Sequence, residues 1–166
     1  QEYQDIRNLG RIFGREERAE ELVGAMQNEI AYVAEKTAHM ERRPRALVIE
    51  LLGKEIRSYG ADTLAGDMMR ALGVDHLAAE GQSLSMEELI TLAPDAIFVV
   101  VIEDDYGNED AILARLYENP ALQDLMCVQQ RRIYPIPLYA VYSAGTRTYD
   151  GITIFAHGLY PQIYGE

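Results

Sequence analysis

The apolar positions follow two patterns along the chain. The pattern of the first 41 residues is helical. Residues 1–41 carry apolar side chains at helical spacing, with Gly14 separating a short first part from one long helix. A helix of about 27 residues is about 40 Å long, which exceeds the width of a small domain. The long helix is therefore expected to extend along or beyond the globular part. Its predicted apolar stripe consists of Ala19, Leu22, Val23, Met26, Ile30, Val33, Ala34 and Thr37.

After Pro44 the pattern changes to short apolar runs that alternate with amphipathic segments. Residues 45–52 and 96–102 show no polar alternation, as expected of strands buried on both faces of a parallel sheet. Strands that alternate with helices predict an α/β fold, a three-layer Rossmann-like lobe with a mostly parallel sheet. A further strand is expected at 132–137, and a short extended piece or turn at 55–60. Helices are expected at 62–73, 85–93, 109–117 and 119–126. A tyrosine-bearing loop at 138–147 precedes a final helix.

The helix at 85–93 has a recognisable start. Ser85 and Glu88 have the spacing of a capping box, in which each side chain accepts a hydrogen bond from a backbone N–H of the helix start. Pro94 then ends the helix. Glu88 is thus assigned a structural role, whereas the adjacent Glu87 has no part in the cap and can point outward.

Composition limits the classes of function. The chain has 166 residues, 48% of them hydrophobic and 25% charged, which allows one ordinary domain with a core. Its net charge of -12 argues against nucleic acid or an anionic membrane surface as the main partner. Cys127 is the single cysteine, so an intrachain disulfide is impossible. Because the chain opens on a helical pattern without a start methionine, it is expected to be a mature or trimmed fragment, and its location stays open.

The common catalytic and phosphate-binding motifs are missing. Neither G-x-G-x-x-G nor G-x-x-x-x-G-K-[ST] occurs, and Ser143 does not lie in a G-x-S-x-G segment. His39, His76 and His157 lie on separate elements, so ordinary packing or surface roles are favoured over a metal site. The acidic loop at 103–110 lacks calcium-loop spacing and is better explained as a solvated loop. These residues predict no enzyme, cofactor or bound metal.

Candidate ligand-binding residues are identified instead by their predicted position in the fold. In an open α/β sheet, ligands bind beyond the carboxyl ends of the strands. Tyrosine offers a stacking face with a polar tip, and arginine pairs with carboxylates and other oxygen-rich anions. The simpler alternative is that loop tyrosines are common in a chain that contains 11 of them. The predicted ligand-binding residues in the loops at that edge are Arg57, Tyr59, Tyr106, Tyr139, Tyr142 and Arg147.

The order of segments resembles a known family. A long helix precedes "SLSMEELITLAPDAIFVV", "NPALQDLMCVQQRRIYPIP" and "AGTRTYDGITIFAHGLYP", and this series is similar to the C-terminal half of class III periplasmic binding proteins. Those proteins are the solute-binding components of ABC importers for ferric siderophores, haem and cobalamin. They have two α/β lobes joined by one long rigid helix, with the ligand between the lobes. The resemblance implies that residues 1–43 are a helical segment with the connecting helix and that 44–166 are the C-terminal lobe.

The resemblance also implies partners. An N-terminal lobe is missing from the chain, so the chain alone is expected to bind ligand weakly or not at all. Leu22, Met26 and Ile30 are expected to be exposed without that lobe and to favour self-association. Glu87 matches the family glutamate that docks into an arginine pocket of the permease, whereas an acid favoured by the helix dipole is the simpler alternative.

The location of the protein and an alternative function are also predicted. The parent protein is expected to be periplasmic or extracellular, with a lipid anchor to the cytoplasmic membrane as one form. The alternative function is a stand-alone receiver-like signalling domain or a small-molecule enzyme, because Asp104 and Asp105 follow a strand. The long N-terminal helix has no role in such a domain.

Overall fold

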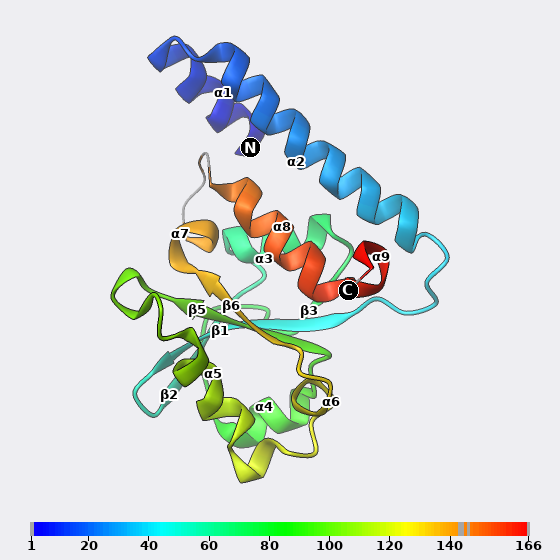
Figure 1. Cartoon of the computed structure of the whole chain (residues 1–166), viewed down its shortest axis with the longest axis vertical. Helices are drawn as coiled ribbons and strands as arrows, with labels where there is room; N and C mark the ends of the chain where they lie inside the picture. The colour runs from blue at the N-terminus through cyan, green and yellow to red at the C-terminus, as the bar shows by residue number, and fades with distance from the viewer. Residues whose placement is uncertain (1, 143–144, 146, 166) are drawn as a thin grey trace.

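The structure is a computed structural model that describes residues 2–142, 145 and 147–165. Its first two helices, α1 (Glu2–Phe13) and α2 (Glu16–Thr37), form a hairpin that lies over the rest of the chain (Figure 1). A Cβ atom on Gly10 would lie 2.6 Å from the Cβ atom of Ala19, so the glycine permits the close approach of the two helices. Arg7 and Glu20 form an ion pair of 2.7 Å across the hairpin. Helices α1 and α2, which are separated near Gly14, confirm the predicted short first segment and the longer helix after it.

Helix α2 has 22 residues and is shorter than the predicted helix of about 27 residues. At its end the Thr37 hydroxyl donates a hydrogen bond to the Val33 carbonyl at 2.8 Å, and the Ala38 amide bonds to Glu35 three residues back. These local bonds replace continued α-helical bonding. The apolar stripe is confirmed in part, with four buried members: Ala19, Val23, Met26 and Val33.

The exposed apolar residues lie elsewhere than predicted. Met26 is only 1% exposed, and Leu22 and Ile30 are half-buried against the core, so the predicted exposure of these three residues is wrong. The reason is that α1 folds back on α2 and the final long helix also contacts it. The most exposed large apolar side chains of the hairpin are instead Ile12 and Phe13 of α1, at 73% and 71%.

The sheet confirms the predicted α/β fold class. Its centre is parallel, because β5 pairs in parallel with both β1 and β6, while β2 runs antiparallel to β1 and β4 antiparallel to β2. The strand order is β4-β2-β1-β5-β6, and β3 pairs in parallel with the start of β1. The strands are β1 (Arg45–Leu52), β2 (Glu55–Tyr59), β3 (Asp75–His76), β4 (Ser83–Leu84), β5 (Ala96–Val101) and β6 (Ile133–Pro137).

Helices cover both faces of this sheet, and each face has its own core (Figure 1). On one face α2, α3 (Leu64–Ala71) and α8 (Thr148–Leu159) pack over Phe98 and its neighbours. On the other face α4 (Met86–Leu92), α5 (Glu109–Tyr117) and α6 (Met126–Gln129) pack over Ile97. Every residue of β5 is buried, which confirms the prediction of a strand covered on both sides.

Short helical segments account for the remaining differences from the sequence prediction. The helix expected at 119–126 is two pieces, because the Asn119 side chain accepts a hydrogen bond from the Ala121 amide and starts a single 3₁₀ turn. The loop expected at 138–147 begins with a short helix. The short segments are η1 (Glu103–Asp105), η2 (Pro120–Leu122), α7 (Leu138–Val141) and α9 (Pro161–Tyr164).

Candidate ligand-binding site

The carboxyl ends of β1, β5 and β6 lie at one edge of the sheet, on the left in Figure 1. The segments that follow these strands were predicted to hold the ligand-binding residues. The segments after β5 and β6 do lie at this edge. The prediction is wrong for residues 57–63, because Arg57 and Tyr59 lie within β2 and this strand runs back from the edge, antiparallel to β1.

Four of the six predicted residues meet at a hollow of about 450 Å³ at this edge. Tyr106 follows β5, and Tyr139 belongs to the short helix α7 after β6. Tyr142 is 73% exposed, and Arg147 lies directly before α8. The complete lining consists of Glu103, Tyr106, Leu138, Tyr139, Tyr142 and Arg147.

Arg147 is held by a ring rather than by a carboxylate. Its guanidinium carbon lies 4.4 Å from the centre of the Tyr139 ring, a cation–π contact. Within the described part of the chain, no ion pair or hydrogen bond of its side chain is recorded. The stacked guanidinium therefore keeps its in-plane N–H donors for an oxygen-rich anion.

The phenol of Tyr106 beside this cation stays protonated. Partial desolvation raises the pKa of Tyr106, and the nearby Tyr139 and Glu103 act in the same direction, while Arg147 opposes them. A neutral phenol is both a donor and an acceptor of hydrogen bonds. The lining of the hollow thus combines the Arg147 guanidinium with tyrosine hydroxyls and the Glu103 carboxylate.

Tyr59 lies behind the hollow rather than in its lining. Its hydroxyl donates to a carboxylate oxygen of Glu50 at 3.5 Å, and burial followed by the Glu50 charge raises the pKa of Tyr59 to about 12. Tyr142 also contributes to that shift, so the two tyrosines are neighbours. Arg57 is exposed on β2, with a guanidinium nitrogen 4.0 Å from Glu55, and does not line the hollow.

Sequence reasoning missed two residues of this region. Glu103 was assigned to a solvated acidic loop, but it lines the hollow. Glu50 was not singled out, although it is the only acid in the apolar strand "RALVIELL". A carboxylate in a strand that is otherwise buried requires a polar partner, and that requirement was the signal available in the sequence.

The histidines, the acidic loop and Ser143 were the other residues considered for a site. Among the described residues, no group of three His, Cys, Asp or Glu side chains is placed to hold a metal ion. The Glu109 carboxylate accepts a hydrogen bond from the Gly107 amide at 2.9 Å, which lowers the pKa of Glu109 and ties the acidic loop to α5. Ser143 lies outside the described residues. Within the described residues, helices long and apolar enough to cross a membrane are absent.

The start of α4 confirms the predicted capping box of Ser85 and Glu88. The Glu88 carboxylate accepts hydrogen bonds from the Ser85 amide at 2.7 Å and from its hydroxyl at 2.8 Å, and the Ser85 hydroxyl accepts one from the Glu88 amide. The bond from the Ser85 amide is the main reason that the pKa of Glu88 is lowered. Glu87 is exposed. Because β4 runs parallel to β1, α4 begins at the same edge of the sheet as the hollow.

Comparison with known proteins identifies the family. A family model described as periplasmic binding protein matches residues 2–140. The chain belongs to the periplasmic binding protein family. The crystal structure of a periplasmic binding protein from Veillonella parvula DSM 2008 is 43% identical and superimposes with a TM-score of 0.92, covering 99% of this chain and 52% of that one.

Two curated relatives from Bacillus subtilis (strain 168) agree with this membership. The iron-uptake system-binding protein is 26% identical over 144 residues, which cover 83% of this chain and 45% of the relative. The uncharacterized ABC transporter substrate-binding lipoprotein YvrC is 24% identical over 170 residues, covering 99% and 51%. This periplasmic binding protein therefore spans about half the length of the curated relatives that it matches. Relatives of this kind are substrate-binding components of transporters, so the resemblance inferred from the sequence is confirmed.

Proposed function

We propose that the chain is the C-terminal lobe, with its connecting helix, of the solute-binding component of an ABC importer, and that it binds an iron–siderophore or similar metal-chelate ligand. The observation that carries this proposal is the hollow in which Tyr106, Tyr139 and Tyr142 surround Arg147. It lies at the edge of the sheet where α/β folds bind ligands.

The charges of the chain favour local recognition of the ligand. A net charge of -12 repels an anion at long range, so a ligand with anionic oxygens needs a cation at the site. Arg147 supplies that cation, and its side-chain donors have no acceptor within the described residues. The tyrosine rings supply flat faces for the organic body of a chelate, which can be a siderophore, a haem or a cobalamin-type ligand.

The proposal includes the division of the chain and its partners. Residues 1–43 form the helical segment with the connecting helix α2, and residues 44–166 form the lobe. A second lobe, which this chain lacks, closes the other side of the ligand, so binding by this chain alone is weak. Glu87 docks to an arginine pocket of the permease, in keeping with its exposed position at the ligand edge. The protein acts outside the cytoplasm, as the lipoprotein relative would.

Equilibrium dialysis of the chain tests the ligand class. A ferric tris-catecholate, a ferric tris-hydroxamate, haem and cobalamin are dialysed separately against the protein at high concentration. Anionic, oxygen-rich chelates should be retained most strongly because Arg147 is the free cation of the hollow. Equal retention of all four ligands would contradict the proposed preference for anionic chelates.

A further inference from the structure

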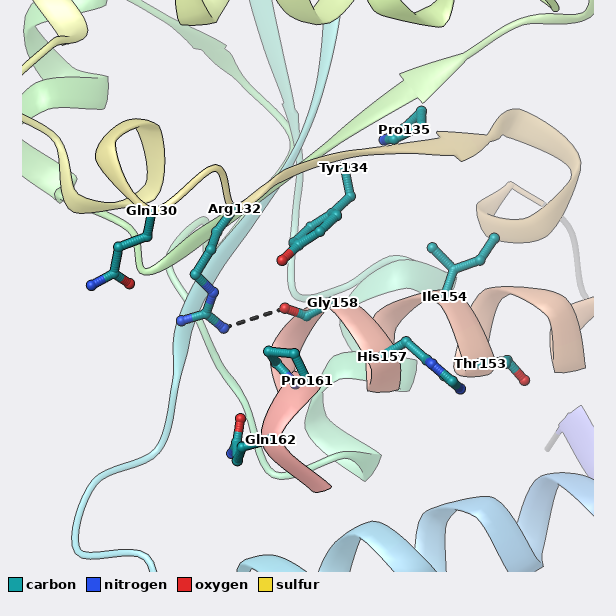
Figure 2. A pocket seen from close by; sticks show the side chains of 10 residues that line it. All are labelled: Gln130, Arg132, Tyr134, Pro135, Thr153, Ile154, His157, Gly158, Pro161 and Gln162. Carbon is teal, nitrogen blue, oxygen red and sulfur yellow. Dashed lines mark hydrogen bonds between the residues drawn. The ribbon is translucent and has the colours of Figure 1, made fainter. Parts of the chain in front are cut away.

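A larger hollow lies at the opposite end of the sheet. It has a volume of about 740 Å³ and opens between β6 and the last turns of α8, beside α9 (Figure 2). Ligand pockets commonly have volumes of about 300–1,000 Å³. Strand β6 ends at the ligand edge with Pro137 and α8 runs back from there, so the end of α8 at Gly158 is remote from Arg147.

Arg132 places a positive charge in this hollow. Its Nη2 atom donates to the carbonyl oxygens of Gly158 at 3.3 Å and Leu159 at 2.9 Å, which fixes the side chain at the end of α8 (Figure 2). Its Nε atom is buried without an acceptor, and no carboxylate pairs with Arg132 among the described residues. The charge of Arg132 is therefore not neutralised by a direct ion pair within the described residues.

The surroundings of Arg132 add to this charge. An adjoining hollow of about 440 Å³ shares Arg132 and is lined by Arg42 and Arg43, against the two carboxylates of Glu41 and Asp95. Arg42 and Asp95 are 2.9 Å apart and neutralise one another. Three arginines against two acids leave one excess positive charge, so the local field attracts an anion.

The rest of the lining is part apolar and part polar, with Thr153 and His157 contributed by α8. The Tyr134 ring points into the hollow, with Pro135 above it and Ile154 opposite (Figure 2). The amides of Gln130 and Gln162 lie on the side of Arg132. An occupant therefore meets an apolar surface at one end and hydrogen-bond donors with a positive charge at the other.

The outer edge of β6 cannot take another strand here. The Ile133 amide, which points away from β5, donates to the Tyr117 hydroxyl at 3.0 Å, and that hydroxyl bonds the Ile133 carbonyl as well. The next residues with the same orientation are Pro135 and Pro137, which have no N–H to donate. A peptide strand is thereby excluded at this edge, and the hollow is left for a small molecule.

We propose that this hollow is a second ligand site, which takes a small amphipathic organic anion. The acid group of the ligand lies at Arg132, and its apolar body lies between Tyr134, Pro135 and Ile154. This second site is independent of the hollow at Arg147. It lies at the other end of the sheet, and the two hollows share no lining residue.

The test is an NMR titration of the ¹⁵N-labelled chain with decanoate. The amide signals of Tyr134, Thr153, His157 and Gly158 should shift in a saturable manner. Decyltrimethylammonium has the same tail with the opposite charge, and it should bind at least tenfold more weakly because it meets Arg132 with like charge. If the two probes bind equally, or if neither shifts these signals, the proposal is wrong.

Two glutamine-to-glutamate variants test whether charge at the hollow controls the affinity for decanoate, because the substitution hardly changes the size of the side chain. Gln162→Glu puts a carboxylate at the rim and should weaken decanoate binding about tenfold. Gln27→Glu makes the same change at an exposed position of α2 and should leave the affinity unchanged. Arg132→Gln removes the cation and should weaken binding about ten- to a hundredfold. Because Arg132 also caps α8, Gln162→Glu decides the result if Arg132→Gln fails to fold, and equal affinities of the two glutamate variants would overturn the proposal.

Discussion

Strand β5 and the segment that follows it differ completely although they adjoin in sequence. All six residues of β5 are buried, whereas the next three residues, Ile102, Glu103 and Asp104, are exposed. The strand packs against helices on both faces, and the next segment lines the ligand edge with Glu103 and Tyr106. The free energy of folding and the proposed recognition of ligand therefore come from separate sets of side chains. Substitutions in β5 should lower the stability of the fold, whereas substitutions in the ligand edge should weaken ligand binding.

The largest effect on stability is expected in the strand. Phe98 is fully buried and packs edge-on against Phe155, with ring centres 4.7 Å apart. Phe98→Ala should lower the free energy of unfolding by about 3–5 kcal/mol, as removal of a buried ring usually does. Tyr142→Ala, at a position that is 73% exposed, should change the free energy of unfolding by no more than about 0.5 kcal/mol. Urea unfolding of both variants measures the contrast, and similar losses would remove the distinction between core and rim.

The largest effect on binding is expected at the rim. Arg147→Ala should weaken the binding of an anionic ferric chelate about ten- to a hundredfold, because a charge-assisted hydrogen bond contributes about 1.5–3 kcal/mol. Its melting temperature should be unchanged, since the exposed Arg147 side chain stacks on the Tyr139 ring and makes no ion pair or hydrogen bond within the described residues. Arg18→Ala is the control, because Arg18 pairs with Glu21 on the surface of α2. Equal affinities of the two variants would exclude Arg147 from the site.

The boundary between core and rim was predictable where it depends on local pattern. The apolar run from Ala96 to Val101 identifies β5, and Ser85 with Glu88 identifies the start of α4, because both signals are complete within a few residues. Tyr106 and Arg147 were placed correctly because ligand sites of parallel sheets lie beyond the carboxyl ends of the strands.

The remaining features depend on contacts between distant segments. Arg57 and Tyr59 were misplaced because the direction of β2 is decided by its pairing with β1, which no local pattern records. The exposure of Met26 was misjudged because α1 folds back across α2, where Gly10 meets Ala19. The hollow at Arg132 requires the end of α8 to lie beside β6, so it had no signal in the sequence.

A smaller effect is expected at the exposed end of α1. Ile12 and Phe13 form an apolar surface that should favour self-association at high protein concentration, because such patches are usually covered. Replacing both residues by lysine should shift sedimentation profiles toward the monomer. A wild-type chain that sediments strictly as a monomer would show that the predicted self-association does not occur.

The smallest effects distinguish the two adjacent glutamates. Glu88→Ala should lower the melting temperature because the capping box is lost, whereas Glu87→Ala should leave it unchanged. The pKa of Glu88 is lowered in the folded state, so its contribution is complete above the unfolded value of 4.5 and is lost as the pH falls through the lower folded value. Melts at pH 7 and at pH 2 should therefore show the Glu88→Ala difference only at the higher pH.

Glu87 has its own readout. In a protein that carries both lobes, Glu87→Ala should reduce uptake through the permease while the affinity for ligand stays the same, because a charged docking contact is lost. Normal uptake would leave Glu87 as an acid that is favoured only by the helix dipole.

The most direct test of the proposed function is to map the ligand on this chain. A gallium(III) catecholate, the diamagnetic counterpart of the ferric chelate, is titrated into the ¹⁵N-labelled protein, since NMR detects weak binding by a single lobe. The amides of Tyr106, Tyr139, Tyr142 and Arg147 should shift together, and in Arg147→Ala the shifts should require about ten- to a hundredfold more ligand. If no signal at this edge moves, or if the variant binds with the same affinity, the ligand edge is not where this lobe binds its chelate.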